Sequence, residues 1–269
     1  MTPTLRRALS AATLALLSTA ADAATMPVPP DFGVVERHAT VTASWSLMRG
    51  ESPSVIDRAA IEQLCTAKRA IGATRSTPVF EGPAGEPNSV EIIHVVATTA
   101  WASYETIRGI VCDPASMDAS KDLCSCTFRS KTSRYVHIRK ANGAGTEVID
   151  ARINDATATR RTSSGVFFHP PGAMADPASL GPVVGHDVIV GRPCSIHRRD
   201  LATLRTELCL TDPTDDTPPA LRYQELASTS FRLEAGVPSR RDWRRVERIE
   251  PDAEIDAGVF DLPAGVVVK

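Results

Sequence analysis

Hydrophobic and polar residues alternate along two stretches of the chain, residues 35–47 and 221–233. Because successive side chains on a β-strand point to opposite faces, this alternation predicts strands with one buried face. In the second stretch the odd positions are mostly apolar, and Glu225 and Leu226 are the exceptions. We therefore expect a long, half-buried antiparallel strand at 221–233 that buries its odd positions.

A helical periodicity follows the first of these stretches. Apolar residues recur three or four positions apart, at Ile56, Ala60, Leu64, Ala67 and Ile71. Ser52 and Ser54 precede the pattern as candidate caps, and Gly72 follows it. The sequence thus predicts a helix over about 54–71, with Cys65 on or near its apolar face.

Several shorter runs also resemble strands, and they lie at 90–96, 134–140, 146–153, 186–190, 194–199 and 206–210. An Asn-Gly pair separates the second run from the third, which favours a β-hairpin. Residues 99–111 fit either a helix or a strand, and 112–126 is expected to be a loop held by its cysteines. The charged stretch 240–256 is interpreted as a mobile or short helical segment.

These elements predict an α+β fold that is mainly β. The simplest architecture is one strongly curved antiparallel sheet with one or two helices packed on its concave face. No internal repeat or firm domain boundary interrupts the pattern. A single domain is therefore expected.

Residues 1–23 have the pattern of a cleaved secretory signal peptide. Arg6 and Arg7 precede an apolar run rich in small residues, and Ala21-Asp22-Ala23 matches the usual cleavage motif. Cleavage would release a single domain, 24–269, with a Pro-rich lead-in at 24–32. Since no later stretch is long and apolar enough to span a membrane, a periplasmic or secreted location is expected.

Charge and cysteine content narrow the picture further. The net charge of −2 gives no electrostatic footprint for nucleic acid. An even number of cysteines in an exported chain favours disulfides. The six cysteines are Cys65, Cys112, Cys124, Cys126, Cys194 and Cys209.

Cys194 and Cys209 flank a polar connection between two predicted strands, which favours a disulfide-linked hairpin. A metal site would add His197 and His186, but structural zinc motifs usually supply paired ligands at both ends. A Cys194–His197 catalytic pair is disfavoured, because positions i and i+3 of a strand point to opposite faces. The pairing of the other four cysteines stays open, and Cys124-Ser125-Cys126 lacks the spacing of the usual redox motif.

No sequence motif identifies a reaction. The chain has no nucleophile elbow, no phosphate-binding loop and no zinc-protease motif. The histidines His38, His94, His137 and His169 each stand alone, as structural or surface histidines usually do. We expect neither a cofactor nor a metal, and no catalytic residue can be assigned.

Two short motifs lie in the last third of the chain, the strand opening Ile189-x-Gly191-x-x-Cys194 and the closing motif Phe260-x-Leu262-Pro263-Ala264-Gly265. Through them, residues 185–269 resemble a group of exported bacterial proteins that are similar to the LolA/LolB-like lipoprotein carriers. This resemblance implies a curved antiparallel sheet over helices, an exported position, and an apolar ligand or a protein partner. It supplies no catalytic residues.

The leading hypothesis is therefore a non-enzymatic envelope protein that binds a lipid-like group or an envelope partner. Alternation along the strands suggests a cavity lined by Trp45, Tyr223, Phe231 and Leu233, although the same pattern fits an ordinary filled core. Two alternatives remain. One is a secreted hydrolase whose residues meet only in the fold, and the other is a structural or secretion-accessory protein.

Overall fold

The computed structural model describes residues 40–51, 58–81, 88–142, 145–163, 181–212, 224–234 and 237–269. The predicted signal peptide at 1–23, the lead-in at 24–32 and Tyr223 lie outside these residues.

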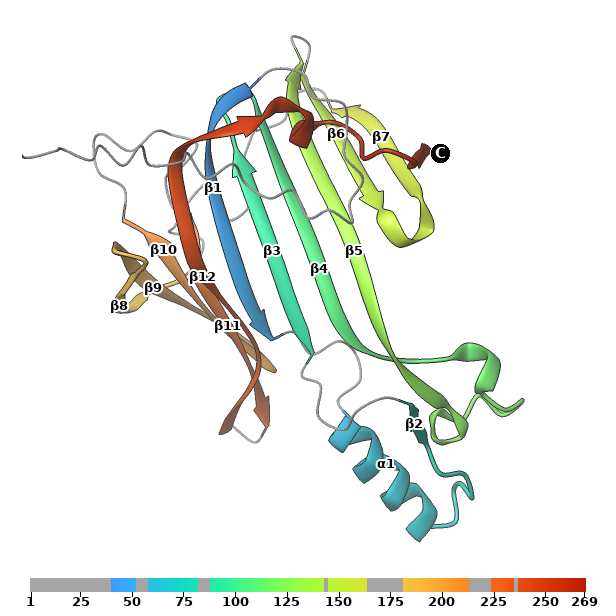
Figure 1. Ribbon diagram of the computed structural model, residues 1–269. Coiled ribbons are helices and arrows are strands. Elements are labelled where there is room, and N and C mark those ends of the chain that lie inside the picture. Colours follow the sequence, from blue (N-terminus) through green and yellow to red (C-terminus); the bar gives the residue numbers. More distant parts are fainter. Residues whose placement is uncertain are drawn as a thin grey trace, which may run out of the picture.

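One large sheet dominates the fold (Figure 1). Its strands are β1 (Thr40–Glu51), β2 (Val79–Glu81), β3 (Ser89–Val96), β4 (Ala100–Cys112), β5 (Thr127–Asn142), β6 (Gly145–Arg152), β7 (Thr157–Ser163), β8 (Val183–Ile189), β9 (Arg192–Leu201), β10 (Leu204–Thr211), β11 (Glu225–Glu234), β12 (Val237–Asp256) and β13 (Val267–Val268). Neighbouring strands are antiparallel, except that β13 runs parallel to β7 and β2 runs parallel to β5. The prediction of a mainly β chain is confirmed, and the sheet is mixed rather than wholly antiparallel.

The strand order divides the sheet into two meanders. Strands β3 to β7 lie side by side in chain order, and so do β8 to β12. β1 lies between them and pairs with β3 on one side and β12 on the other. The first long strand of the chain is thus the seam that joins the two halves.

The helical elements are few in the described part of the chain. They are α1 (Arg58–Ala70) and the 3-10 turns η2 (Pro114–Ser116), η3 (Leu123–Ser125), η4 (Ile153–Asp155) and η7 (Ala257–Phe260). The predicted helix is confirmed over 58–70, and its expected start at 54–57 lies outside the described residues.

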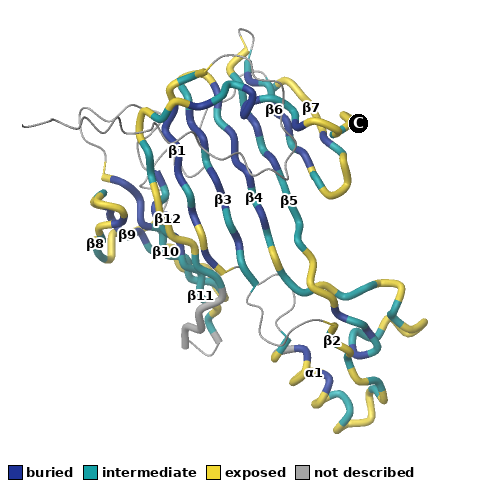
Figure 2. Tube along the Cα trace, in the orientation of Figure 1, coloured by how far each residue is buried: buried dark blue, intermediate teal, exposed yellow. Residues whose placement is uncertain are grey.

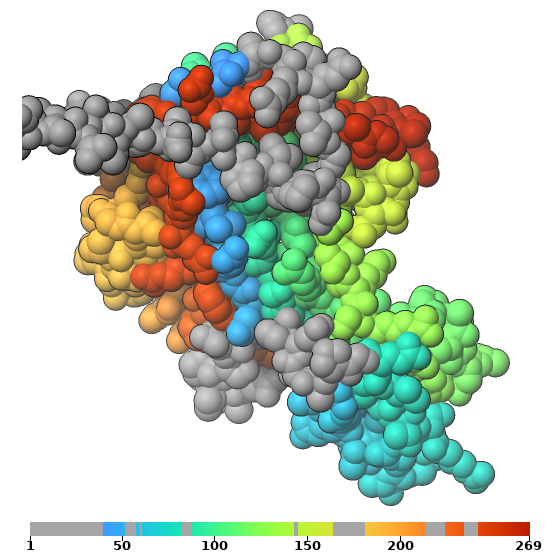
Figure 3. All heavy atoms as spheres, viewed as in Figure 1, coloured from blue at the N-terminus to red at the C-terminus, as the bar shows by residue number. Residues whose placement is uncertain are grey.

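The position expected for the helix differs from the one observed. α1 lies beyond the ends of β4 and β5, where it forms a separate lobe with β2 and the turns after β4 (Figures 1 and 3). Ile61 and Cys65 of α1 pack there with Phe80 and Phe128. The helix therefore covers the end of two long strands rather than a concave face of the sheet.

The hairpin predicted around Asn-Gly is confirmed, since β5 ends at Asn142 and β6 begins at Gly145. The ambiguous stretch 99–111 is a strand, because β3 and β5 pair with β4 along both of its edges. Residues 112–126 form the expected loop with its cysteines.

The prediction of a mobile or helical segment at 240–256 is wrong. These residues belong to β12, which pairs with both β1 and β11. Val246 lies opposite Met48 and Ile249 lies opposite Ser46, so four residues of β12 lie opposite three residues of β1. This β-bulge places two apolar residues three positions apart on one face, and the spacing imitates a helix.

The buried face of β11 also differs from the prediction. Leu226 and Ser228, at even positions, are buried, whereas Ala227, Phe231 and Leu233 are only half-buried. Register shifts interrupt β11 against both neighbours, near Cys209 and near Ser230. Because each shift changes which side chains share a face, no single alternation describes the strand.

Alternate residues of β3 to β6 point to two different faces, which we name the core face and the polar face. The core face carries Ile93 and Val95 together with Tyr104 and Ile138. The η7 turn covers part of it through Val259 and Phe260. Figure 2 shows buried residues spaced along these central strands.

The part of the sheet formed by β8 to β12 is locally curved, so that β12 and β8 come into contact. Arg245 Nη1 of β12 lies 3.1 Å from Asp187 Oδ2 of β8, although three strands lie between them in the sheet. In a flat sheet the two strands would be about 19 Å apart, at about 4.8 Å per strand. Strong curvature of the whole sheet stays a prediction.

Candidate functional site

A row of polar side chains crosses the polar face. Each member lies directly opposite the next one on the neighbouring strand, and the row runs Ser46, His94, Ser103, His137, Asp150 and Thr159. Side chains at such positions have Cβ atoms about 4.5–5.5 Å apart. The row therefore forms one continuous polar track across β1 and β3 to β7.

A pocket of about 180 Å³ opens on the middle of this row. Its lining comes from six strands and consists of Met48, Ile92, His94, Trp101, Ser103, Glu105, His137, Arg139, Glu225 and Arg244. Most pockets for drug-sized ligands are larger, roughly 300–1,000 Å³. This one suits a small molecule or the end group of a larger one.

Three buried polar atoms in the lining have no hydrogen-bond partner among the described residues. They are Trp101 Nε1, Ser103 Oγ and Glu225 Oε1. A buried polar group without a partner costs about 1–3 kcal/mol. Their concentration in one pocket indicates that a polar occupant, water or ligand, completes the site.

His94 is neutral near pH 7. Burial, and secondarily the positive charge of Arg244, lower its pKa from 6.5 to about 4. A neutral imidazole has one donor and one acceptor nitrogen. His94 therefore offers the pocket a hydrogen-bonding group without a charge.

Two residues of the lining, His137 and Arg139, are bonded to Asp150 on the neighbouring strand β6. His137 Nδ1 and Arg139 Nη1 each lie 2.9 Å from Asp150 Oδ1. Partial burial alone would raise the pKa of Asp150, but hydrogen bonds from His137 and Arg139 outweigh it and lower the pKa. The carboxylate stays ionised and fixes His137 with its Nδ1 proton toward Asp150.

Arg139 interacts with several partners besides Asp150. It also donates to the carbonyl oxygens of Ile138 (2.9 Å) and Ile149 (3.2 Å). Its guanidinium lies 5.3 Å from the centre of the Trp101 ring, within the range of a cation–π contact. Arg139 thus acts as a fixed wall of the pocket.

Ser103, His137 and Asp150 follow one another in the order of nucleophile, base and acid. A catalytic serine is normally hydrogen-bonded to its histidine, although apo structures can show this bond lengthened. Within the part of the chain that the structure describes, Ser103 Oγ makes no hydrogen bond. The row supplies the residue types of a hydrolase without the connected nucleophile.

A second Ser/His/Asp group lies on β8 and β9. Ser195 Oγ donates to Asp212 Oδ1 at 2.6 Å and lies 3.2 Å from His186 Nδ1. Because the serine proton points to the carboxylate, the imidazole can only donate to Ser195 Oγ. These two hydrogen bonds link β8, through Ser195 of β9, to the residue after β10. They do not activate the serine as a nucleophile.

All six cysteines form disulfides, Cys65–Cys124, Cys112–Cys126 and Cys194–Cys209. The last is the linked hairpin expected from sequence, with its Cα atoms 5.4 Å apart. Cys209 lies opposite Ile196 and Cys194 opposite Thr211, so the bridge runs diagonally across the two strands. His197 donates from Nδ1 to the Gly181 carbonyl and is separate from Cys194.

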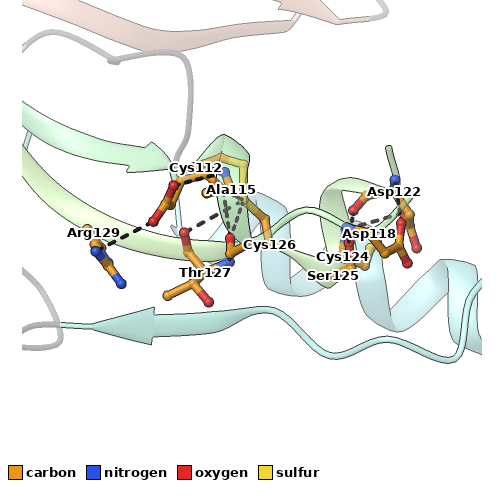
Figure 4. The surroundings of a disulfide bond; sticks show 11 residues. Cys112, Ala115, Asp118, Asp122, Cys124, Ser125, Cys126, Thr127 and Arg129 are labelled. Carbon is orange, nitrogen blue, oxygen red and sulfur yellow. Dashed lines mark hydrogen bonds and ion pairs between the residues drawn. A yellow bond between two sulfur atoms is a disulfide. The ribbon is translucent and has the colours of Figure 1, made fainter. Parts of the chain in front are cut away.

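The other two disulfides tie the lobe at the end of β4 and β5. Cys112 at the end of β4 is joined to Cys126 just before β5 (Figure 4). Beside this disulfide, Thr127 N donates to Ser116 Oγ. Cys65–Cys124 fastens α1 to η3. Across the described residues, no three His, Cys, Asp or Glu side chains lie close enough to hold a metal ion.

The predicted apolar cavity stays a prediction, because Tyr223, one of its four lining residues, lies outside the described residues. Trp45 is buried in the cluster of the core face, on the side opposite the pocket. It lies beside Glu250 of β12, whereas Phe231 lies beside Arg240, ten residues away on that strand. At about 3.3 Å per residue, ten residues correspond to about 33 Å along a straight strand, so Trp45 and Phe231 lie far apart along β12.

Sequence reasoning missed the pocket residues on β3 to β5. His94 and His137 were interpreted as isolated histidines, and their strand register brings them to either side of Ser103. A signal existed in the alternation of Trp101, Ser103 and Glu105 along β4, which gives this strand a polar face.

Comparison with known proteins assigns the chain to no family. No protein-family model matches the chain, and no curated protein matches it. Among the helices in the described ranges, none has the length and apolar character needed to cross a membrane.

Proposed function

We propose that the protein is an exported, non-enzymatic binding protein that holds a small polar ligand in the pocket on the polar face. The observation that carries this proposal is the convergence of unpartnered Trp101 Nε1, Ser103 Oγ and Glu225 Oε1 on one cavity. A ligand that hydrogen-bonds these atoms recovers their desolvation cost, which gives the site a preference for polar molecules.

An exported position is part of the proposal. Three disulfides support it, because disulfides persist in oxidising compartments such as the bacterial periplasm and the cell exterior. The signal-peptide pattern of residues 1–23 points the same way.

The resemblance to LolA/LolB-like carriers would instead favour a strongly curved sheet around a lipid-like ligand. The pocket lining supports a different ligand chemistry, since only Met48 and Ile92 among its residues are aliphatic or thioether side chains. We therefore propose a polar ligand, and a lipid bound to the protein isolated from envelope fractions would favour the carrier reading instead.

Ligand-observed NMR with a set of small polar metabolites tests the binding function. The wild-type protein is compared with Ser103→Val, which places a methyl group in the pocket, and with Ser195→Val as the matched control outside it. Binding that is lost in Ser103→Val and kept in Ser195→Val supports the proposal. Binding that is the same in all three proteins, or no binding, contradicts it.

A hydrolase is the second candidate, and the order of Ser103, His137 and Asp150 favours it. In that case Ser103 Oγ attacks an ester carbonyl, His137 takes the serine proton and returns it to the leaving alcohol, and water then releases the acid. A fluorophosphonate probe followed by peptide mapping tests this candidate. Covalent labelling of Ser103 that disappears in His137→Gln supports it, and an unlabelled Ser103 rejects it.

A further inference from the structure

The charged side chains that line the pocket differ in how closely they are paired with opposite charges. Arg139 is matched by Asp150, which lies just outside the lining. Arg244 and Glu225 face each other with Nη2 and Oε1 3.9 Å apart, beyond hydrogen-bond range. Glu105 has no ion-pair or hydrogen-bond partner among the described residues. Among the charged side chains of the lining, Glu105 is therefore the one for which the described residues supply no counter-charge.

The two carboxylates of the lining lie on different strands around an apolar floor. Glu105 belongs to β4 and Glu225 to β11, and Met48 and Ile92 lie in the same lining between them in the sheet order. Glu225 is largely buried, with its side chain 14 % exposed, whereas Arg244 is 43 % exposed and faces water. Solvent therefore screens the arginine more than the carboxylate.

A metal ion does not fit this arrangement. Divalent ions need several oxygen or nitrogen ligands within about 2.0–2.6 Å. In the described part of the chain no three suitable side chains converge in this way. A cation that balances the pocket must be larger and must bring its own hydrogen-bond donors.

We propose that the pocket selects a small organic ammonium ion, whose N–H groups bond to Glu105 and Glu225 and whose short carbon chain lies over Met48 and Ile92. An ammonium group has three donors and no acceptor, which matches two carboxylates. The contact would give Glu225 Oε1 the hydrogen bond that Arg244, 3.9 Å away, does not provide. This inference rests on the proposed binding function and adds the chemical class of the ligand.

Three probes of equal carbon number test the class, namely n-butylammonium, butyrate and 1-butanol. At pH 8 the amine is protonated, because its pKa resembles that of lysine, about 10.4. Binding is followed by the indole N–H signals of the three tryptophans in two-dimensional NMR, and Trp101→Phe identifies the signal of Trp101. The expected result is a shift of the Trp101 signal with n-butylammonium at the lowest concentration of the three.

Glu105→Gln and Glu225→Gln should each weaken n-butylammonium binding about tenfold or more, the factor that corresponds to one lost charge contact. Glu91→Gln is the matched control, since Glu91 precedes Ile92 on β3, points to the core face and pairs with Arg49. It should leave the affinity unchanged.

The outcomes separate the two proposals. Tighter binding of butyrate than of n-butylammonium at the Trp101 signal overturns the ammonium class and leaves the polar pocket in place. Equal loss of affinity in Glu91→Gln also overturns the class. If none of the probes, and no metabolite of the earlier screen, shifts the Trp101 signal, the binding function itself is overturned.

Discussion

The hydroxyl of Tyr104, on β4, donates a hydrogen bond to the main-chain carbonyl of Val259 in η7, although 155 residues separate the two. Both residues are buried in the cluster of the core face. Burial, and secondarily the negative charge of Asp261, raise the pKa of Tyr104. The hydroxyl therefore keeps its proton, and the bond fastens the C-terminal segment to the centre of the sheet.

Tyr104→Phe should lower the free energy of unfolding by about 1–3 kcal/mol, because it leaves a buried carbonyl without this donor. Urea unfolding measures the change. Tyr135→Phe, on the neighbouring strand and only half-buried, is the control and should have a smaller effect. Equal effects of the two substitutions would show that the bond to Val259 adds nothing.

Removing the Cys194–Cys209 disulfide should destabilise the protein by about 3 kcal/mol, the chain-entropy value for a loop of about 15 residues. The double variant Cys194→Ala/Cys209→Ala is compared with wild type by urea unfolding under oxidising conditions. Non-reducing peptide mapping checks the bridge itself. Free thiols at both positions in the oxidised wild-type protein would contradict the assignment.

Gly50→Ala should strongly destabilise the seam between β1 and β12. A Cβ atom at Gly50 would lie 1.9 Å from the carbonyl oxygen of Trp243 and 2.7 Å from Arg244 Cα. Both are backbone atoms that cannot rotate away, so we expect a loss of about 3 kcal/mol, at the upper end for overpacked sites.

Gly72→Ala is the matched control for this substitution. Gly72 has φ +70° and no atom within 4 Å of the added Cβ, so only left-handed strain of about 1 kcal/mol applies. Thermal unfolding of the two variants measures the difference. A larger loss in Gly72→Ala than in Gly50→Ala would contradict the close approach of the strands.

Stability should fall as the pH decreases from about 6.5 to about 4 because of His94. Its folded pKa of about 4 lies below the unfolded value of 6.5, so only the unfolded chain takes up the proton in this window. The full shift would correspond to about 3 kcal/mol, and partial access of water to the pocket reduces the expected loss to about 1–2 kcal/mol.

His94→Gln removes this titration and should flatten the pH dependence between those values. Urea unfolding at several pH values compares the variant with wild type and with His186→Gln, whose side chain is exposed. A wild-type slope that persists unchanged in His94→Gln would show that another group is responsible.

Local sequence patterns predicted the elements that depend on neighbouring residues. The helix at 58–70, the hairpin around Asn142 and the strands β3, β9 and β10 follow from spacing and turn residues. Their positions in the sheet, and the placement of α1 at its end, depend on contacts between distant segments. Periodicity within a short window does not contain that information.

Bulges and register explain most of what the sequence did not predict. The bulge near Glu247 lets Val246 and Ile249 share a face, and this spacing concealed β12. The pocket depends on register even more, since Ser103 and His137 meet only because β4 and β5 pair at that position. A shift by one residue would have turned one side chain to the core face.

The central place of β1 has a consequence for how the protein is synthesised. β1 pairs with β3 soon after both are made, but its other edge waits for β12, whose Asp256 lies opposite Thr40. Pairings between such distant segments form slowly. During synthesis, the growing chain would carry an open edge of β1 until β12 is made. A chaperone that covers β1 until then would protect the chain from aggregation.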